Sequence, residues 1–241
     1  MIDFSYIAYI QQIANQIIAR GQSLTDFSDL SERRLFSEEF LMKQGIFYCS
    51  EDEYEYIGGY DNLTMSTVRF GGAVINCWIY PLKMHNVIVG WCAWNPEDGE
   101  YTNLFFQGVI KSQVIFGLTP DIYEGGTAIL VEGITDKYRI DYCDLKGGCG
   151  LMGNKITDYN RMLLKRVKRK IFIPDRDSTG MDAMKIWDRM VDGEKYWILL
   201  DGEVKDIDQR LKERPELVPQ FVALIKEIED GAYMSGTKII F

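Results

Sequence analysis

The residues that decide the fold are TAILVEGITDKYRI, at positions 127–140, and KIFIPDRDSTGMDA, at positions 170–183. Each stretch begins with a short apolar run, stops at acidic residues and continues into a helix-like segment. A strand, a tight turn and a helix in repetition predict a parallel sheet that helices cover on both faces. A third apolar run, residues 196–200, also ends in acid, at Asp201. We therefore expect an α/β fold with a parallel central sheet flanked by helices.

Acidic side chains follow the first two of these strands directly. Ligands bind beyond the carboxyl ends of the strands in open parallel sheets, so these acids should gather at one edge. Clustered carboxylates repel one another unless a cation lies between them, and hard oxygen ligands suit Mg²⁺ or Mn²⁺. The sequence therefore predicts a divalent-metal site formed by four acids, Glu132, Asp136, Asp175 and Asp177.

Composition limits the other possibilities. The 241 residues suffice for one large domain or two small ones, and the net charge of −9 argues against tight, autonomous binding of nucleic acid. Five scattered cysteines without a C-x-x-C pair and a single histidine, His85, offer no zinc ligand set, so we expect no zinc. Without a signal peptide or a membrane-length apolar run, the chain is expected in the cytoplasm, with no membrane partner.

The first half of the chain changes from helices to strands. Apolar spacing predicts a helix over residues 1–21 with Gly21 as its C-cap, and Ser31 and Ser37 are candidate helix starts. Strands are expected at 66–70, 73–80 and 87–93, with Pro81 closing the second and His85-Asn86 forming a turn.

The second half reads as helices between strands. We expect helices over 136–146, from Asp158 to about Arg169, over 182–190 and over 217–229, a strand or turn at 151–156, and a strand after Gly231. The cations at the end of the 158–169 segment suit a helix C-terminus, and a nucleic-acid patch is the alternative interpretation.

The order of the acidic motifs resembles a known domain. E-G-x-x-D at 132–136, D-x-D at 175–177 with Gly180 beyond it, and K-D-x-D at 205–208 are similar to the TOPRIM domain, and most to the catalytic core of bacterial and phage DNA primases of the DnaG type. The segments that precede the TOPRIM domain in primases are also matched, at 78–82, 87–91, 101–103 and 111–118. The resemblance covers about Leu30 to Arg210.

The resemblance implies a TOPRIM domain at 123–212, preceded by an α+β primase-type subdomain at 56–122, an N-terminal helical segment at 1–55 and a C-terminal helix and tail at 213–241. It implies a nucleotidyltransferase that makes short RNA primers on single-stranded DNA from ribonucleoside triphosphates with Mg²⁺ or Mn²⁺. Glu132, Asp175 and Asp177 would be catalytic, and Asp136, Asp206 and Asp208 would be further metal ligands. Gly133 and Gly180 would admit the backbone close to the site. Nucleotide or template would contact four residues, Lys111, Asn103, Lys83 and Arg139.

The sequence also departs from the family. Cys77, Trp94 and Glu100 stand where basic residues are expected, and the zinc-binding and helicase-binding domains have no counterpart. We therefore expect a primase of a phage or another mobile element that depends on a replicative helicase or a single-strand-binding protein. A TOPRIM metal-dependent nuclease and a non-catalytic replication subunit remain the alternatives.

Overall fold

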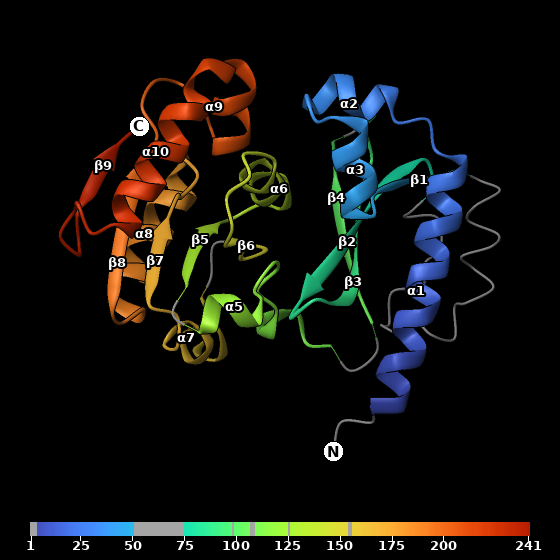
Figure 1. The fold of residues 1–241 in the computed structure, drawn as a ribbon, viewed down its shortest axis with the longest axis horizontal. Helices are drawn as coiled ribbons and strands as arrows, with labels where there is room; N and C mark the ends of the chain where they lie inside the picture. Colours follow the sequence, from blue (N-terminus) through green and yellow to red (C-terminus); the bar gives the residue numbers. More distant parts are fainter. Residues whose placement is uncertain (1–3, 51–74, 98, 107–108, 125, 154–155) are drawn as a thin grey trace. The chain divides into compact units, whose positions relative to one another are not determined.

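A computed structural model describes residues 4–50, 75–97, 99–106, 109–124, 126–153 and 156–241 of the chain, which forms two compact units (Figure 1). The first unit consists of Met1–Lys83 with Val87–Lys111, and the second of Met84–Asn86 with Ser112–Phe241. The main boundary between the two units follows Lys111. No helix in the described part of the chain is both long and apolar enough to cross a membrane.

The first unit is a four-stranded sheet with helices. The strand order is β1-β2-β3-β4, and the pairs β1–β2 and β3–β4 are antiparallel. Its elements are α1 (Phe4–Leu24), α2 (Ser28–Arg34), α3 (Glu38–Gln44), β1 (Phe47–Cys49), β2 (Cys77–Met84), β3 (Val87–Trp94) and β4 (Tyr101–Phe105). The strand expected at 66–70 lies outside the described residues.

Helix α1 packs one apolar face on this sheet. Its buried positions, Ile10, Ile13, Ala14 and Ile17, have helical spacing and join one core cluster with residues of all four strands. The helix does not end at Gly21, as expected, but continues to Leu24. A Cβ atom at position 21 would overlap the ring of Phe47 on β1. The glycine is therefore explained by close packing against an aromatic ring and not by a helix end.

The expected β-hairpin forms from β2 and β3, but Pro81 does not end its first strand. His85 and Asn86 have φ values of 53° and 63°, which is the backbone of a two-residue hairpin turn. Pro81 lies within β2, which runs on to Met84. Among the described residues, the register between β1 and β2 runs from Cys77 to Ile79, so Pro81 lies beyond this ladder, a position where a strand tolerates proline.

The short helices follow their capping residues. Ser37 caps α3 by accepting a hydrogen bond from the Phe40 N–H, and Gly45 ends the helix with a φ of 83°. Ser31, expected to start a helix, lies inside α2 instead, where its hydroxyl donates to the carbonyl of Phe36 at 2.6 Å.

The second unit is a five-stranded, wholly parallel sheet in the order β6-β5-β7-β8-β9, as the sequence predicts. Two short 3₁₀ turns, Lys111–Gln113 at its start and Pro215–Leu217, complete the regular structure of the described residues. Its elements are α5 (Pro120–Tyr123), β5 (Thr127–Val131), α6 (Ile134–Tyr142), β6 (Gly148–Gly150), α7 (Asp158–Leu164), β7 (Arg169–Phe172), α8 (Ser178–Met190), β8 (Glu194–Leu199), α9 (Ile207–Glu213), α10 (Val218–Glu229) and β9 (Lys238–Ile240).

Helices cover both faces of the parallel sheet. Alternate residues of β5 point to opposite sides: Ile129 and Val131 join a core with α6, α9 and α10, whereas Ala128 and Leu130 join a core with α5, α7 and α8. Burial on both faces accounts for the unbroken apolar runs in the sequence. It also forces the chain to leave the sheet at the strand ends, where the acids lie.

The second core contains a stack of three aromatic rings. Phe172 on β7 lies 4.5 Å from Trp197 on β8, centroid to centroid, with their planes 19° apart. Trp187 on α8 stacks on Trp197 at 6.4 Å and 16°. The stack joins α8 to the sheet at the strand that ends before Asp175.

Several boundaries in this unit differ from those expected. Helix α6 starts at Ile134 and ends at Tyr142, before the expected 146, because the chain takes a left-handed backbone at Asp144, with a φ of 57°, and again at Gly147, with a φ of 98°, on its way into β6. Strand β6 precedes the expected 151–156. Helix α7 is capped by Thr157, through a capping box with Asn160, and it ends at Leu164 so that Arg169 can begin β7. Helix α9 was not expected at all.

The role of Gly21 is testable. In an ordinary helix, Gly→Ala stabilises by about 1 kcal/mol. Here we expect Gly21→Ala to lower the free energy of unfolding by about 1–3 kcal/mol, because the new methyl group overlaps the Phe47 ring. Urea unfolding of the purified protein measures the change.

The control is the same substitution in a Phe47→Leu background, which removes the ring. In that background Gly21→Ala should be neutral or stabilising. Equal destabilisation in both backgrounds would show that the ring is not the cause.

Candidate functional site

The site begins where β5 and β7 end side by side. Leu130 is the register partner of Phe172, and the Ile173 N–H donates to the Leu130 carbonyl at 2.9 Å, so the two strands end together. The next residues of each strand therefore meet: the Glu132 carboxylate accepts a hydrogen bond from the Asp175 backbone N–H at 3.3 Å. The two acids placed first in the sequence motifs are neighbours.

Both carboxyl groups resist ionisation. Burial, followed by repulsion from Asp175, raises the pKa of Glu132 from 4.5 to about 7. Burial also raises the pKa of Asp175 to about 6, against the opposing effect of the nearby Lys205 ammonium. Two carboxylates held together at the end of buried strands are best ionised when a cation neutralises them.

Two glycines allow this close packing. A Cβ atom at Gly180 would overlap the Asp175 carbonyl oxygen and lie 2.8 Å from Oε1 of Glu132. A Cβ atom at Gly133 would lie 2.5 Å from Oδ2 of Asp136. Gly180 thus lies against Glu132 and Asp175, and Gly133 lies against Asp136.

Asp177 and Asp206 each cap a helix. The Asp177 carboxylate accepts from the Gly180 N–H at 2.8 Å at the start of α8, and Asp206 accepts from the Gln209 N–H at 2.8 Å at the start of α9. Capping orients one oxygen of each side chain toward the backbone. Asp177 itself is exposed to solvent.

Asp208 and Arg139 form a buried ion pair, with a distance of 2.8 Å between Arg139 Nε and Asp208 Oδ1 and about 4% of each side chain exposed. Arg139, expected to contact nucleotide, and Asp208, expected to be a metal ligand, are thus partners of each other in the structure, and those two roles stay predictions. Asp136 lies beside the pair and accepts a hydrogen bond from the Asp208 N–H at 3.1 Å. Its burial, with repulsion from Asp206 and other acids, raises the pKa of Asp136 well above the usual value. Asp136 is thus buried and hydrogen-bonded, and its role as a metal ligand stays a prediction.

The six expected ligands do not form one coordination sphere. Among the described residues, no three Asp, Glu, His or Cys side chains stand together in a metal-binding arrangement. The smaller set of Glu132, Asp175 and Asp177 interacts electrostatically and offers only carboxylate oxygens. Asp175 already accepts a cation, because the Lys205 ammonium lies 3.5 Å from its Oδ2. Carboxylate oxygens are the donors that hard divalent cations such as Mg²⁺ or Mn²⁺ prefer, so the chemistry of these side chains suits such an ion, although the described residues do not surround a coordination site.

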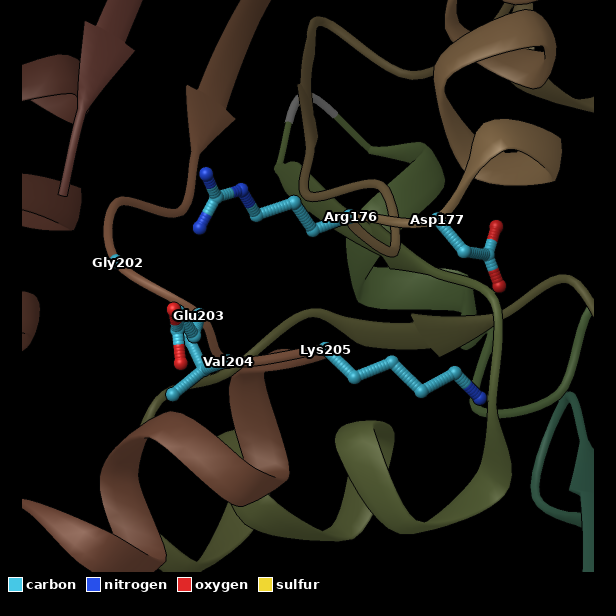
Figure 2. Close-up of a pocket in the computed structure, with 6 residues that line it drawn as sticks. All are labelled: Arg176, Asp177, Gly202, Glu203, Val204 and Lys205. Atoms are coloured by element: carbon cyan, nitrogen blue, oxygen red, sulfur yellow. The ribbon is translucent and has the colours of Figure 1, made fainter.

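The sequence analysis missed two cations at the site. Arg176 lies between Asp175 and Asp177, and Lys205 precedes Asp206, and both side chains are exposed. They line one pocket together with Asp177 (Figure 2). The sequence indicates both cations, because Arg176 lies within D-R-D and Lys205 begins K-D-x-D. The sequence analysis gave roles only to the acids of these motifs.

Three residues of the first unit were expected to bind nucleotide or template, and each contacts different neighbours: Asn103, Lys111 and Lys83. Asn103, on β4, is the register partner of Cys92, and its buried side-chain oxygen has no hydrogen-bond partner among the described residues. Lys111 is exposed, and its charge acts on the Cys92 thiol. Lys83 donates to the carbonyl of Gln44 at 3.1 Å, at the end of α3. A role for these three side chains in nucleotide or template binding stays a prediction.

Comparison with known proteins finds similarity in structure and not in sequence. No protein-family model and no curated protein matches the chain. The RNA polymerase domain of Mycobacterium tuberculosis primase DnaG matches with a TM-score of 0.70 at 17% identity, over 90% of this chain and 83% of that one.

Two further solved structures match comparably. The zinc-binding and RNA polymerase domains of the Aquifex aeolicus primase give a TM-score of 0.69 at 19% identity, over 96% of this chain and 67% of that chain. A DnaG primase catalytic domain bound to single-stranded DNA gives a TM-score of 0.65 at 16% identity, over 91% of this chain and 80% of that chain. The chain therefore has the fold of the catalytic cores of DnaG-type primases, as the resemblance of its acidic motifs to a TOPRIM primase core implied.

Proposed function

We propose that this protein is a DNA primase, a nucleotidyltransferase that joins ribonucleotides into short primers on a single-stranded DNA template. The observation that carries the proposal is the pairing of Glu132 with Asp175 at the ends of adjacent parallel strands, in a fold shared with primase cores. The structural neighbour bound to single-stranded DNA supports the same class of template.

Each side chain at the site has a part in this proposal. Glu132 and Asp175 would hold Mg²⁺ or Mn²⁺ with the exposed carboxylate of Asp177, and Gly180 leaves room for them. The bound cation would supply the positive charge that offsets these carboxylates and the phosphates of a nucleoside triphosphate. Asn103 and Lys111 would contact nucleotide or template. The acidic surface makes template binding weak, so a helicase or a single-strand-binding protein is the expected partner.

The carboxylate pair makes the stability of the protein depend on pH. The folded pKa values of Glu132 and Asp175, about 7 and about 6, lie above the ordinary values of 4.5 and 3.8. Groups of this kind favour the fold below their unfolded pKa and lose that contribution as pH rises through the folded pKa. In EDTA, we therefore expect Glu132→Gln to match wild type near pH 4.5 and to melt at least ~2 °C higher at pH 8.

Divalent cations should favour wild type over the Glu132→Gln variant in melting temperature. Mn²⁺ at pH 8 should raise the melting temperature of wild type more than that of Glu132→Gln, because one ligand charge is missing in the variant. Glu32→Gln, at an exposed site in the other unit, controls for the loss of a charge. Equal Mn²⁺ shifts in wild type and Glu132→Gln would place the cation elsewhere.

Primer synthesis tests the activity directly. Wild type with single-stranded DNA, ribonucleoside triphosphates and Mg²⁺ or Mn²⁺ should give short RNA products, resolved on a denaturing gel. Glu132→Gln and Asp175→Asn should each reduce synthesis at least ~10²-fold while the melting curve stays cooperative, because each removes a major electrostatic contribution. Cleavage of the template in place of synthesis, lost in the same variants, would replace the primase with a nuclease.

Lys111 provides a separate test of template or nucleotide binding. Lys111→Ala should weaken binding of a labelled oligonucleotide or raise the nucleotide KM by several-fold, and the log–log slope of affinity against salt should fall by about 1 if the contact is to a template phosphate. Fluorescence anisotropy over a salt series measures both changes. Unchanged template affinity, salt slope and nucleotide KM would remove Lys111 from the site.

A further inference from the structure

Two of the five cysteines, Cys49 and Cys77, lie directly opposite each other in the sheet of the first unit. They are register partners in the antiparallel ladder of β1 and β2. Side chains of directly opposite residues stand on the same face of a sheet. Both cysteines accordingly belong to one core cluster, with exposed fractions of 0% and 3%, and both are free thiols. The primer-synthesis proposal gives neither of them a role.

The backbone holds this pair at the end of the ladder. The Asn76 N–H donates to the Cys49 carbonyl at 2.8 Å, and Asn76 has a φ of 58°, which turns the chain into β2. The Cys49 thiol donates to the Ser50 carbonyl at 3.7 Å, and the Cys77 thiol donates to the Ile75 carbonyl at 3.5 Å. Because the two strands are antiparallel, both thiols are directed toward the same end of the ladder.

The spacing of such a pair suits a covalent bond between the sulfur atoms. Opposite residues in an antiparallel ladder have Cα atoms about 4.5 or 5.5 Å apart, and disulfides join Cα atoms about 4.4–6.8 Å apart. Their Cβ atoms lie about 4.5–5.5 Å apart, and a disulfide holds them at about 3.8 Å, so closure requires a movement of about 1 Å. Strand β1 can make this movement, because it has three residues and lies at the edge of the described sheet.

The other three cysteines are placed differently. Trp91 and Ala93 of β3 join the core cluster of the pair, so Cys92 between them points to the opposite face of the sheet. Cys143 and Cys149 belong to the second unit, where each joins a different core. The fold therefore brings together one pair of thiols that the sequence separates.

We propose that Cys49 and Cys77 form a site of reversible thiol oxidation, at which a disulfide joins β1 to β2. The oxidant is a small disulfide such as oxidised glutathione. The thiolate of one cysteine attacks it, which releases one small thiol and leaves a mixed disulfide on the protein. The thiolate of the other cysteine then attacks the protein sulfur, and the second small thiol leaves. Two protein thiols thus lose two electrons and two protons, and one small disulfide gains them.

Refolding of the full chain from urea in a buffer of reduced and oxidised glutathione tests the proposal, since unfolding removes the barrier that burial sets to the reaction. Free thiols are then alkylated with N-ethylmaleimide in denaturant, and the chain is analysed by mass spectrometry. Wild type should carry two fewer alkyl groups than the five of the fully reduced chain, with no bound glutathione. Peptide mapping should recover Cys49 linked to Cys77.

Cys77→Ala and Cys92→Ala are matched variants, because each removes one buried thiol from the same sheet. Cys92→Ala should form the disulfide as wild type does, whereas Cys77→Ala should form none. Oxidised wild type and oxidised Cys92→Ala should melt at least ~4 °C above their reduced forms, because the bond restricts the unfolded chain. Dithiothreitol should reverse the shift, and Cys77→Ala should melt at the same temperature in both buffers.

Five alkyl groups on refolded wild type would overturn the proposal, as would a disulfide that links Cys92 in place of either partner. A bond between Cys49 and Cys77 that lowers the melting temperature would also overturn it, because the native ladder would then not accommodate the bond. None of these measurements depends on primer synthesis, so the failure of either proposal leaves the other intact.

Discussion

The register between β5 and β7 is the constraint on which the site depends. The pairing of Leu130 with Phe172 is fixed on both faces of the sheet, because neighbouring residues of each strand are divided between two separate cores. A shift of the register would move apolar side chains from one core to the other. The strands must end level, and Glu132 must meet Asp175. Electrostatic repulsion at the site is thus maintained by hydrophobic packing elsewhere.

The ion pair between Arg139 and Asp208 shows a second use of acids in the same region. It joins α6 to α9 in a place where both charges are almost wholly removed from water. Removing one partner of such a pair is strongly destabilising, since the other charge is left buried and uncompensated. The acidic motifs of this chain therefore divide into a set at the ends of β5 and β7 and a set that holds two helices together.

Local signals in the sequence predicted local structure well. Ser37 and Gly45 delimit α3, and His85-Asn86 forms the hairpin turn, because a cap or a turn depends on residues a few positions apart. The apolar runs likewise predicted the three central parallel strands. The acids that follow β5 and β7 could be placed at one edge because all parallel strands end on the same side.

The failures concern contacts between distant residues. Nothing near Gly21 indicates that Phe47 will occupy the space beside it, and nothing near Arg139 indicates a partner 69 positions away. The short α9 was not predicted because Asp206 was interpreted as a metal ligand and not as the residue whose carboxylate also caps that helix. The same attention to acids left Arg176 and Lys205 without a role.

The aromatic stack of the second unit also gives the molecule an intrinsic optical label. Of the five tryptophans in the sequence, Trp187 and Trp197 are the two in this unit, and their indole rings lie nearly parallel at 6.4 Å. Rings at this separation couple their electronic transitions, so the pair contributes a circular dichroism signal that requires α8 to be packed on β8. Loss of this contribution would report separation of α8 from the parallel sheet in the unmodified protein.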